Sequence, residues 1–424
     1  MENMIQNVDF SKYNNVFCDS LEALEWAYKN GLPKSAIVKS SAPAMLWDKK
    51  ININNIEARW TTDELEKFQE GVQELTELVF DSILSIPGVE REIALSVTDV
   101  VYRFQKIIYK AACLDESDFT DPRLFIYVDG ETGPSGNIMN SPWDQLLSPN
   151  PLFSMVNYTL KNDNWNQLTT QGISYWSRYK IAGFETIVYR LAKKIMKRLP
   201  SWLFTKELIV PNENELNIEI ASSLALHGVR VTELELDKSF SIVKNKTKEG
   251  DISTLYEVVQ PIMHERIEEW VTPSAVKITM LLFNSHLQEQ LKKFKLLVDK
   301  LENNIVKSHK IKQSVLMNAP GNIRGFALSY VCRKNGIPIM SSQHGVTVEI
   351  SKQHSMVRYE HDNSVADVMF SYNRKIIKVE KNTHFNHSKH YSVGMPLRLM
   401  RMKYANTTDR LALPIVFIST NLYN

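Results

Sequence analysis

The segment that most constrains this chain is residues 336–346, Gly-Ile-Pro-Ile-Met-Ser-Ser-Gln-His-Gly-Val, in which an apolar run ends at polar residues. Upstream of it, residues 314–317 predict a short strand, 318–322 a turn, and 323–334 a helix with apolar residues at helical spacing. Gly336 fits the position just beyond a helix end, which glycine fills best. A strand, a helix and a second strand within about thirty residues predict a right-handed parallel crossover.

The same alternation of apolar runs and helical patterns recurs along the chain. It predicts an α/β fold, a Rossmann-like parallel sheet with flanking helices. Strands are expected at 15–18, 36–39, 124–128, 206–210, 229–234, 365–370 and 390–393, and helices at 21–30, 61–86, 90–112, 172–199, 212–227, 253–270 and 274–303. Residues 137–170, rich in Asn, Pro, Trp and Ser, predict a long ordered loop.

The length of the chain favours more than one structural unit. A chain of 424 residues exceeds what one hydrophobic core usually organises. We assign residues 1–396 to a Rossmann-like amino-terminal, acceptor-side domain with helical insertions and residues 397–413 to a linker, which would include a short basic helix. An apolar run at 415–419 predicts the first strand of a second domain at 414–424, which would be truncated or absent here.

Composition excludes several classes of protein. A formal net charge of +2 gives no global attraction to nucleic acid, so no nucleic-acid partner is expected. The three cysteines lack Cys-x-x-Cys spacing, which argues against a disulfide scaffold or a zinc ribbon. No run approaches the roughly eighteen apolar residues of a membrane span, so we expect a cytoplasmic protein. His384, His387 and His390 are three residues apart but run into a predicted strand, and no metal site is predicted.

Polar residues follow predicted strands at two places. Gln343, His344 and Gly345 lie just past a strand end, where open α/β sheets bind their ligands. Asp129 and Glu131 follow another apolar strand, where a carboxylate can act as a general base or a nucleophile. Each pattern also has a purely structural interpretation. Gly345 can supply a turn on which His344 packs, and an Asp-Gly pair commonly forms a turn.

The turn before the helix at 323–334 is a second candidate binding element. It reads Asn318-Ala-Pro-Gly321-Asn322-Ile-Arg324 and combines backbone N–H groups at a helix start with a cation. These are the ingredients of a cradle for an anion or for sugar hydroxyls. The Gly-x-Gly-x-x-Gly spacing of dinucleotide-binding proteins is absent from it.

A basic helix end followed by aromatic residues suggests contact with a membrane. Cations on one face with aromatics beyond them are typical of an interfacial anchor. The alternative is a solvated face whose cations complement the helix dipole. The residues are Arg190, Lys193, Lys194, Lys197, Arg198 and Trp202.

Three segments together resemble a known family. They are residues 336–346, Ala-Asp-Val-Met-Phe-Ser at 366–371 and Tyr-Ser-Val-Gly-Met-Pro at 391–396. They are similar to the end of the amino-terminal domain of GT-B glycosyltransferases of bacterial surface-polysaccharide synthesis. The nearest likeness is to capsule and O-antigen enzymes, including Kdo and related ulosonate transferases, in which Gln-His-Gly recurs. The resemblance covers residues 313–424, and the earlier part only by architecture.

The resemblance implies transfer of a sugar from a nucleotide-sugar donor, of which a CMP-ulosonate is one candidate, to a glycan or lipid-linked glycan acceptor. Gln343, His344 and Gly345 would line the cleft between two Rossmann domains, and His344 would hydrogen-bond the sugar or a donor phosphate. Asp129 or Glu131 would activate the acceptor hydroxyl or attack the anomeric carbon. No cofactor and no metal are expected. The expected location is the cytoplasm, and the basic helix end described above would allow contact with the inner face of the membrane.

The expected early end of the chain departs from the family pattern, because GT-B enzymes hold most of the donor nucleotide in the carboxyl-terminal domain. Two other functions therefore stay open. A nucleotide-sugar 2-epimerase of the same fold would release an epimerised product without an acceptor. A non-catalytic glycan-binding module would bind glycan without nucleotide.

Overall fold

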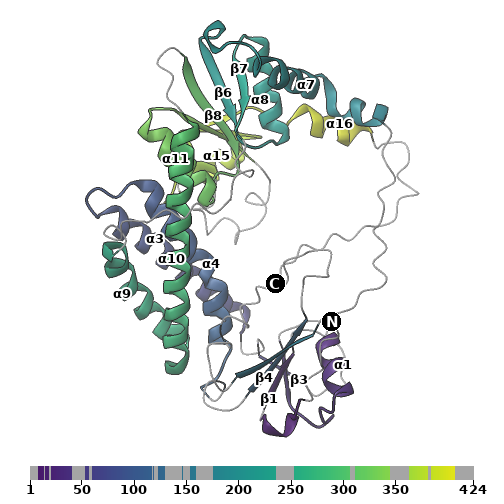
Figure 1. Ribbon diagram of the computed structural model, residues 1–424, viewed down its shortest axis with the longest axis vertical. Coiled ribbons are helices and arrows are strands. Elements are labelled where there is room, and N and C mark those ends of the chain that lie inside the picture. Colours follow the sequence, from purple (N-terminus) through teal and green to yellow (C-terminus); the bar gives the residue numbers. More distant parts are fainter. Residues whose placement is uncertain are drawn as a thin grey trace.

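The chain is an α/β protein with two parallel sheets flanked by helices (Figure 1). In Figure 1 the two sheets lie at opposite ends of the molecule, and the long helix α10 (Pro273–Asn304) runs between those ends. The computed structural model describes residues 8–13, 15–18, 21–40, 53–56, 60–116, 118, 123–128, 146, 153–158, 175–234, 253–305, 311–343, 362–380 and 383–405.

The first sheet has the order β3-β2-β1-β4-β5 among the described strands, and every pair is parallel. Helix α1 (Leu21–Lys29) buries Leu24 against Val16 and Leu124 of the sheet, which confirms the alternation predicted for the start of the chain. The 3-10 helix η1 spans Phe10–Lys12. The strands are β1 (Asn15–Cys18), β2 (Val38–Ser40), β3 (Ile53–Asn55), β4 (Arg123–Val128) and β5 (Phe153–Tyr158).

The second sheet has the order β11-β10-β9-β8-β6-β7, again with parallel pairs throughout. Helices cover both of its faces, as the side chains of β8 show: Leu316 packs with α8 (Glu215–Leu226), whereas Val315 and Met317 belong to the core cluster that includes α11 (Ile323–Lys334). The strands are β6 (Lys206–Val210), β7 (Arg230–Glu233), β8 (Lys312–Asn318), β9 (Ile339–Ser342), β10 (Val368–Ser371) and β11 (Lys389–Ser392).

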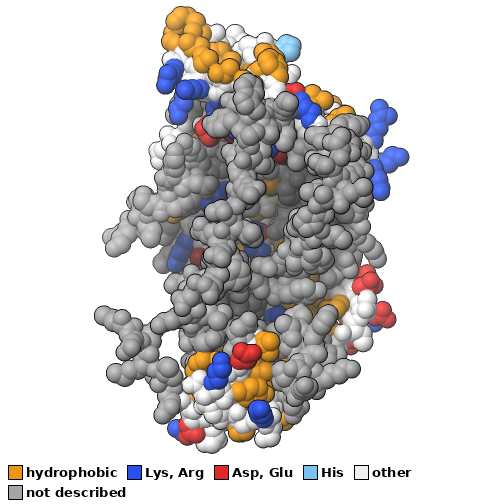
Figure 2. All heavy atoms as spheres, turned by 90° about the vertical axis from the view of Figure 1, so that its right-hand side faces the viewer, with side chains coloured by type: hydrophobic (Ala, Val, Ile, Leu, Met, Phe, Trp, Pro, Cys, Tyr) orange, Lys and Arg blue, Asp and Glu red, His pale blue; other side chains and the backbone are white. Residues whose placement is uncertain are grey.

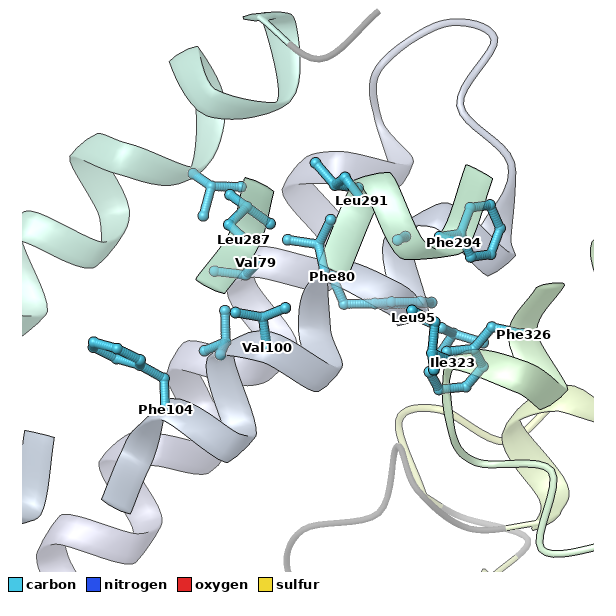
Figure 3. Close-up of a cluster of buried hydrophobic side chains, with 14 of the residues drawn as sticks. Val79, Phe80, Leu95, Val100, Phe104, Leu287, Leu291, Phe294, Ile323 and Phe326 are labelled. Atoms are coloured by element: carbon cyan, nitrogen blue, oxygen red, sulfur yellow. The ribbon is translucent and has the colours of Figure 1, made fainter. Parts of the chain in front are cut away.

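The largest core cluster is helical. Helices α3 (Thr62–Leu84), α4 (Arg91–Ala112), α9 (Ser253–Trp270) and α10 pack their apolar stripes together and meet α11 (Figure 3). A capping box begins α3, because the Glu64 N–H donates to Thr61 Oγ1 at 3.2 Å and the Thr61 N–H donates to Glu64 Oε2 at 2.7 Å. Figure 3 shows Phe80, Leu95, Leu291, Phe294, Ile323 and Phe326 among the packed side chains.

The last described helix, α16 (Leu397–Ala405), docks on α8 and on α7 (Tyr175–Met196). The Leu397 N–H donates to Glu219 Oε1 at 2.7 Å, and Arg401 pairs with Glu185 at 2.9 Å. Helix α7 is kinked at Gly183, whose φ of 72° suits glycine. The other short helices that the structure describes are η3 (Ser201–Leu203), α14 (Asp362–Val365) and α15 (Arg374–Glu380).

The structure differs from the sequence prediction in the number of sheets. We expected one parallel sheet within residues 1–396, whereas the described strands of that range form two. Strand β5 also lies inside the segment predicted as a loop at 137–170, and β3 was not predicted. Periodicity along the chain identifies a strand but not its neighbour, because pairing joins distant residues. The helix expected in the linker is confirmed as α16; residues 406–424 lie outside the described part, so the domain boundaries there stay a prediction.

Candidate functional site

The candidate site lies at the carboxyl edge of the second sheet, where the strand order reverses. From β6 the chain adds β7 on one side and then crosses to place β8 on the other side. In open α/β sheets, ligands bind in the crevice outside the carboxyl ends of strands at such a switch point. The residues that follow β6, β8, β9 and β10 therefore define the site.

Asn212, two residues after β6, bridges the switch point to β8. Its Nδ2 donates to the Asn318 carbonyl oxygen at 2.6 Å, and its Oδ1 accepts from the Asn318 N–H at 2.7 Å. One amide side chain thus pairs with both the N–H and the carbonyl group of Asn318. Strand β6 ends before it could pair with them, since its register with β8 runs only to Ile209 and Val315. This pair of hydrogen bonds fixes the distance between the two strand ends.

Within the described part of the chain, Asn318 presents a buried, unpartnered side-chain acceptor at this edge, as does Asn217 at the start of α8. The Asn318 Oδ1 is buried and accepts no hydrogen bond from any described residue. The next residue, Ala319, has a φ of 47°, a left-handed conformation that is uncommon for a residue with a Cβ atom. Asn322 holds this turn by donating from Nδ2 to the Ala319 carbonyl oxygen at 2.8 Å. A buried acceptor beside a strained backbone is typical of a ligand site.

The start of α11 restricts the predicted anion cradle. Asn322 Oδ1 accepts from the N–H groups of Arg324 at 3.0 Å and Gly325 at 3.3 Å, so the cap occupies two of the donors that an anion would use. Gly325 allows the turn to lie close to the helix, because a Cβ atom there would overlap the Pro320 carbonyl group. The geometry here is that of a tight turn with a capped helix, and Gly321 lies buried within it.

The ends of β9 and β10 are also tied by polar side chains. Ser342, the last residue of β9, is hydrogen-bonded to Asn214, with the Asn214 Nδ2 donating to Ser342 Oγ at 2.9 Å. Gln343 is 3 % exposed, and its Oε1 accepts from the Tyr372 N–H at 2.9 Å. That oxygen of Gln343 positions the turn after β10 and is not open to a substrate.

The structure brings together five of the residues predicted from sequence and leaves four untested. Those at the carboxyl edge of the second sheet are Asn318, Gly321, Asn322, Arg324 and Gln343. Asp129, Glu131, His344 and Gly345 lie outside the described residues. Sequence reasoning missed Asn212, Asn214 and Ser342. The same strand-end rule applied to residues 206–210 would have found the first two.

Lys193 was predicted to contact a membrane, but it forms ion pairs beside this edge. Its Nζ lies 2.7 Å from Glu213, which follows β6, and 3.0 Å from Glu233, the last residue of β7. Burial alone would lower the pKa of Lys193, yet the hydrogen bonds to the two carboxylates raise it above its ordinary value. Lys193 is therefore held as a cation against the protein.

Neither metal ligation nor membrane spanning is found in the described residues. They contain no group of three or more His, Cys, Asp or Glu side chains that could hold a metal ion. The three spaced histidines have separate partners: His384 contacts Asp81 at 3.0 Å, His387 contacts Arg333 at 2.8 Å and His390 contacts Asn386 at 3.0 Å. None of the helices that the structure describes has the length and apolar character that crossing a bilayer needs.

Comparison of the chain with protein-family models, with curated proteins and with solved structures found no match. What the site can bind therefore follows from its own geometry and from the resemblance of residues 336–346, 366–371 and 391–396 to GT-B glycosyltransferases.

Proposed function

We propose that the chain is a glycosyltransferase of the GT-B type, which transfers a sugar from a nucleotide-sugar donor to a glycan or lipid-linked glycan acceptor of a bacterial surface polysaccharide. The observation that carries the proposal is the polar switch point of the second sheet, with its unpartnered Asn318 Oδ1. Two parallel sheets are also compatible with it, because the GT-B fold has two; residues 206–392 would then form the donor-side unit, and not the end of the acceptor-side domain that the resemblance implied.

The donor would bind at the carboxyl edge of the second sheet. There Asn318 Oδ1 would accept a hydrogen bond from a base N–H or a sugar hydroxyl. The cation of Arg324 at the start of α11 would favour the phosphates, together with the helix dipole. A hydrogen bond from the donor would satisfy this buried oxygen, which otherwise destabilises the fold because it has lost its contact with water.

The chemistry would use groups that follow strand ends in both halves of the chain. The carboxylate of Asp129 or Glu131 would take the proton of the acceptor hydroxyl, whose oxygen then attacks the anomeric carbon. The bond from that carbon to the phosphate oxygen breaks, and the nucleotide leaves with the electron pair. His344 would hydrogen-bond the departing phosphate and stabilise its charge.

Nucleotide release from a panel of CMP-, UDP- and GDP-linked sugars, measured with and without a glycan acceptor, tests the proposal. We expect release with at least one donor and loss of turnover in Asp129→Ala and in His344→Ala. Full activity of both variants, or no release from any donor, would refute the assignment. An epimerised nucleotide-sugar formed without acceptor would assign the chain to the epimerases instead.

Donor affinity gives a second test that depends on Asn318 alone. Asn318→Ala removes the unpartnered acceptor, and we expect donor binding to weaken about tenfold, since a single buried hydrogen bond contributes about 1.5 kcal/mol. The matched control is Asn303→Ala, an exposed amide at the end of α10. Calorimetric titration with the donor found by the panel measures both. Equal weakening in the two variants would remove Asn318 from the site.

A further inference from the structure

One face of α7 carries large exposed apolar side chains that no described part of the chain covers. The opposite face is buried, since Tyr189 and Ala192 belong to the core cluster formed with α8 and β7. On the outer face Phe184 is 66 % exposed, Leu191 51 % and Ile195 53 %. Ile187, which is 37 % exposed, lies between the first two. Positions 184, 187, 191 and 195 recur at spacings of three and four along the helix, so they form one continuous stripe.

The stripe continues past the end of the helix into η3. Leu199 is exposed, Trp202 is 74 % exposed and Leu203 is 50 % exposed. Figure 2 shows hydrophobic side chains gathered at the end of the molecule where α7 and α8 lie in Figure 1, beside Lys and Arg side chains. A contiguous apolar surface of this kind marks an interaction site, whereas isolated exposed apolar residues need no explanation. We call residues 184–203 the α7 surface.

Cations flank the stripe. Arg190, Lys194, Lys197 and Arg198 are all exposed, and none of them forms an ion pair with another residue in the described part of the chain. The single acidic residue among residues 184–203 is Glu185. Its carboxylate is bound by Arg401, and this pairing holds the pKa of Glu185 below its ordinary value. The charge that the α7 surface offers to a partner is therefore positive.

We propose that the α7 surface binds the face of an anionic lipid bilayer, with α7 lying in the plane of the interface. The apolar stripe would enter the boundary between headgroups and acyl chains, the flanking cations would contact lipid phosphates, and Trp202 would lie at headgroup depth. Charge complementarity favours this occupant, because a row of uncompensated cations beside an apolar stripe matches anionic headgroups over acyl chains. The proposal does not depend on the function proposed above.

Flotation of the full chain with phospholipid vesicles tests the proposal. We expect binding to vesicles of three parts phosphatidylglycerol to seven parts phosphatidylcholine, and much weaker binding to phosphatidylcholine alone. The charge variant is Lys194→Glu/Lys197→Glu. We expect its affinity for the anionic vesicles to fall about fivefold for each cation removed. The apolar variant is Leu191→Ser/Ile195→Ser, for which a loss of about tenfold or more is expected.

Matched controls lie on α10. Lys292→Glu/Lys293→Glu makes the same charge change on an exposed face, and Leu281→Ser removes an apolar side chain that is 61 % exposed. Both should float like the unaltered protein. Thermal unfolding of every variant near that of the unaltered chain shows that a loss of binding is not a loss of fold.

Three outcomes would overturn the proposal. One is no flotation of the unaltered chain with anionic vesicles. Another is equal flotation of the unaltered chain and both α7 variants. The third is a concentration-dependent dimer in light scattering that Leu191→Ser/Ile195→Ser abolishes without changing flotation, which would make the α7 surface an interface between copies of this chain.

Discussion

Replacing Asn212 with alanine should weaken the switch point of the second sheet. The substitution removes hydrogen bonds of 2.6 and 2.7 Å and leaves the N–H and the carbonyl group of Asn318 without partners. Each unsatisfied buried group costs about 1–3 kcal/mol. Because the site is half-buried and water can reach part of it, we expect the lower end for the two together, about 2 kcal/mol.

Hydrogen exchange at the Asn318 amide is the most direct assay of this loss. A change of about 2 kcal/mol corresponds to roughly thirtyfold faster exchange, and urea unfolding should report a free energy lower by a similar amount. Asn212→Asp separates the two bonds, since a carboxylate still accepts from the Asn318 N–H but repels its carbonyl oxygen. The amide should then stay protected while stability falls.

Unchanged exchange and an unfolding free energy within about 0.5 kcal/mol of the unaltered protein would refute this reasoning. Asn303→Ala, at the exposed end of α10, is the control and should change neither measurement.

Three further predictions concern elements around the same sheet. Gly325→Ala should lower the free energy of unfolding by about 1–3 kcal/mol, because its Cβ atom would overlap the Pro320 carbonyl group; urea unfolding measures this, and an unchanged midpoint would contradict it. Arg333→Met should lower the free energy of unfolding by about 3 kcal/mol, because the buried carboxylate of Glu92 loses its cation and keeps the hydrogen bond from Ser329 Oγ. Thermal unfolding measures the loss, and a shift no larger than that of an exposed lysine variant would count against it. Burial alone would raise the pKa of Asp367, but its hydrogen bonds and Arg333 lower it below 3.8. The ionised Asp367 carboxylate therefore stabilises the fold above about pH 4, and this stabilisation is lost as the pH falls through the pKa that Asp367 has in the folded protein. The difference in unfolding free energy between the unaltered chain and Asp367→Asn should then become smaller in acid. A difference that grows in acid would contradict this reasoning.

Local patterns in the sequence predicted most of the elements. The unit from β8 to β9 follows the predicted strand, turn, helix and strand, with α11 beginning and ending as expected. The helix predicted at 61–86 begins within a residue of the start of α3, at Thr62. Strand β5 escaped prediction because the segment around it is rich in turn-forming residues and lacks clear alternation. Its structure depends on pairing with β4.

The candidate site was predicted only in part, because its residues are visible in the sequence but their hydrogen-bond partners are not. Asn318, Asn322 and Gln343 were found because they follow strands or begin a helix, which is visible in the sequence. Their roles could not be predicted, because residue types alone do not specify hydrogen-bond partners. Gln343 supports a neighbouring turn, and Asn322 binds backbone N–H groups of the helix that an anion would otherwise use.

The sequence by itself determined the type and approximate position of most helices and strands, because periodicity and caps act over a few residues. Only the tertiary structure decided that the strands form two sheets and that Asn212 meets Asn318, 106 residues away. It also decided which face of α7 is left uncovered. Strand pairing and helix docking join groups far apart in the chain, and no local pattern records which partner each of them will find.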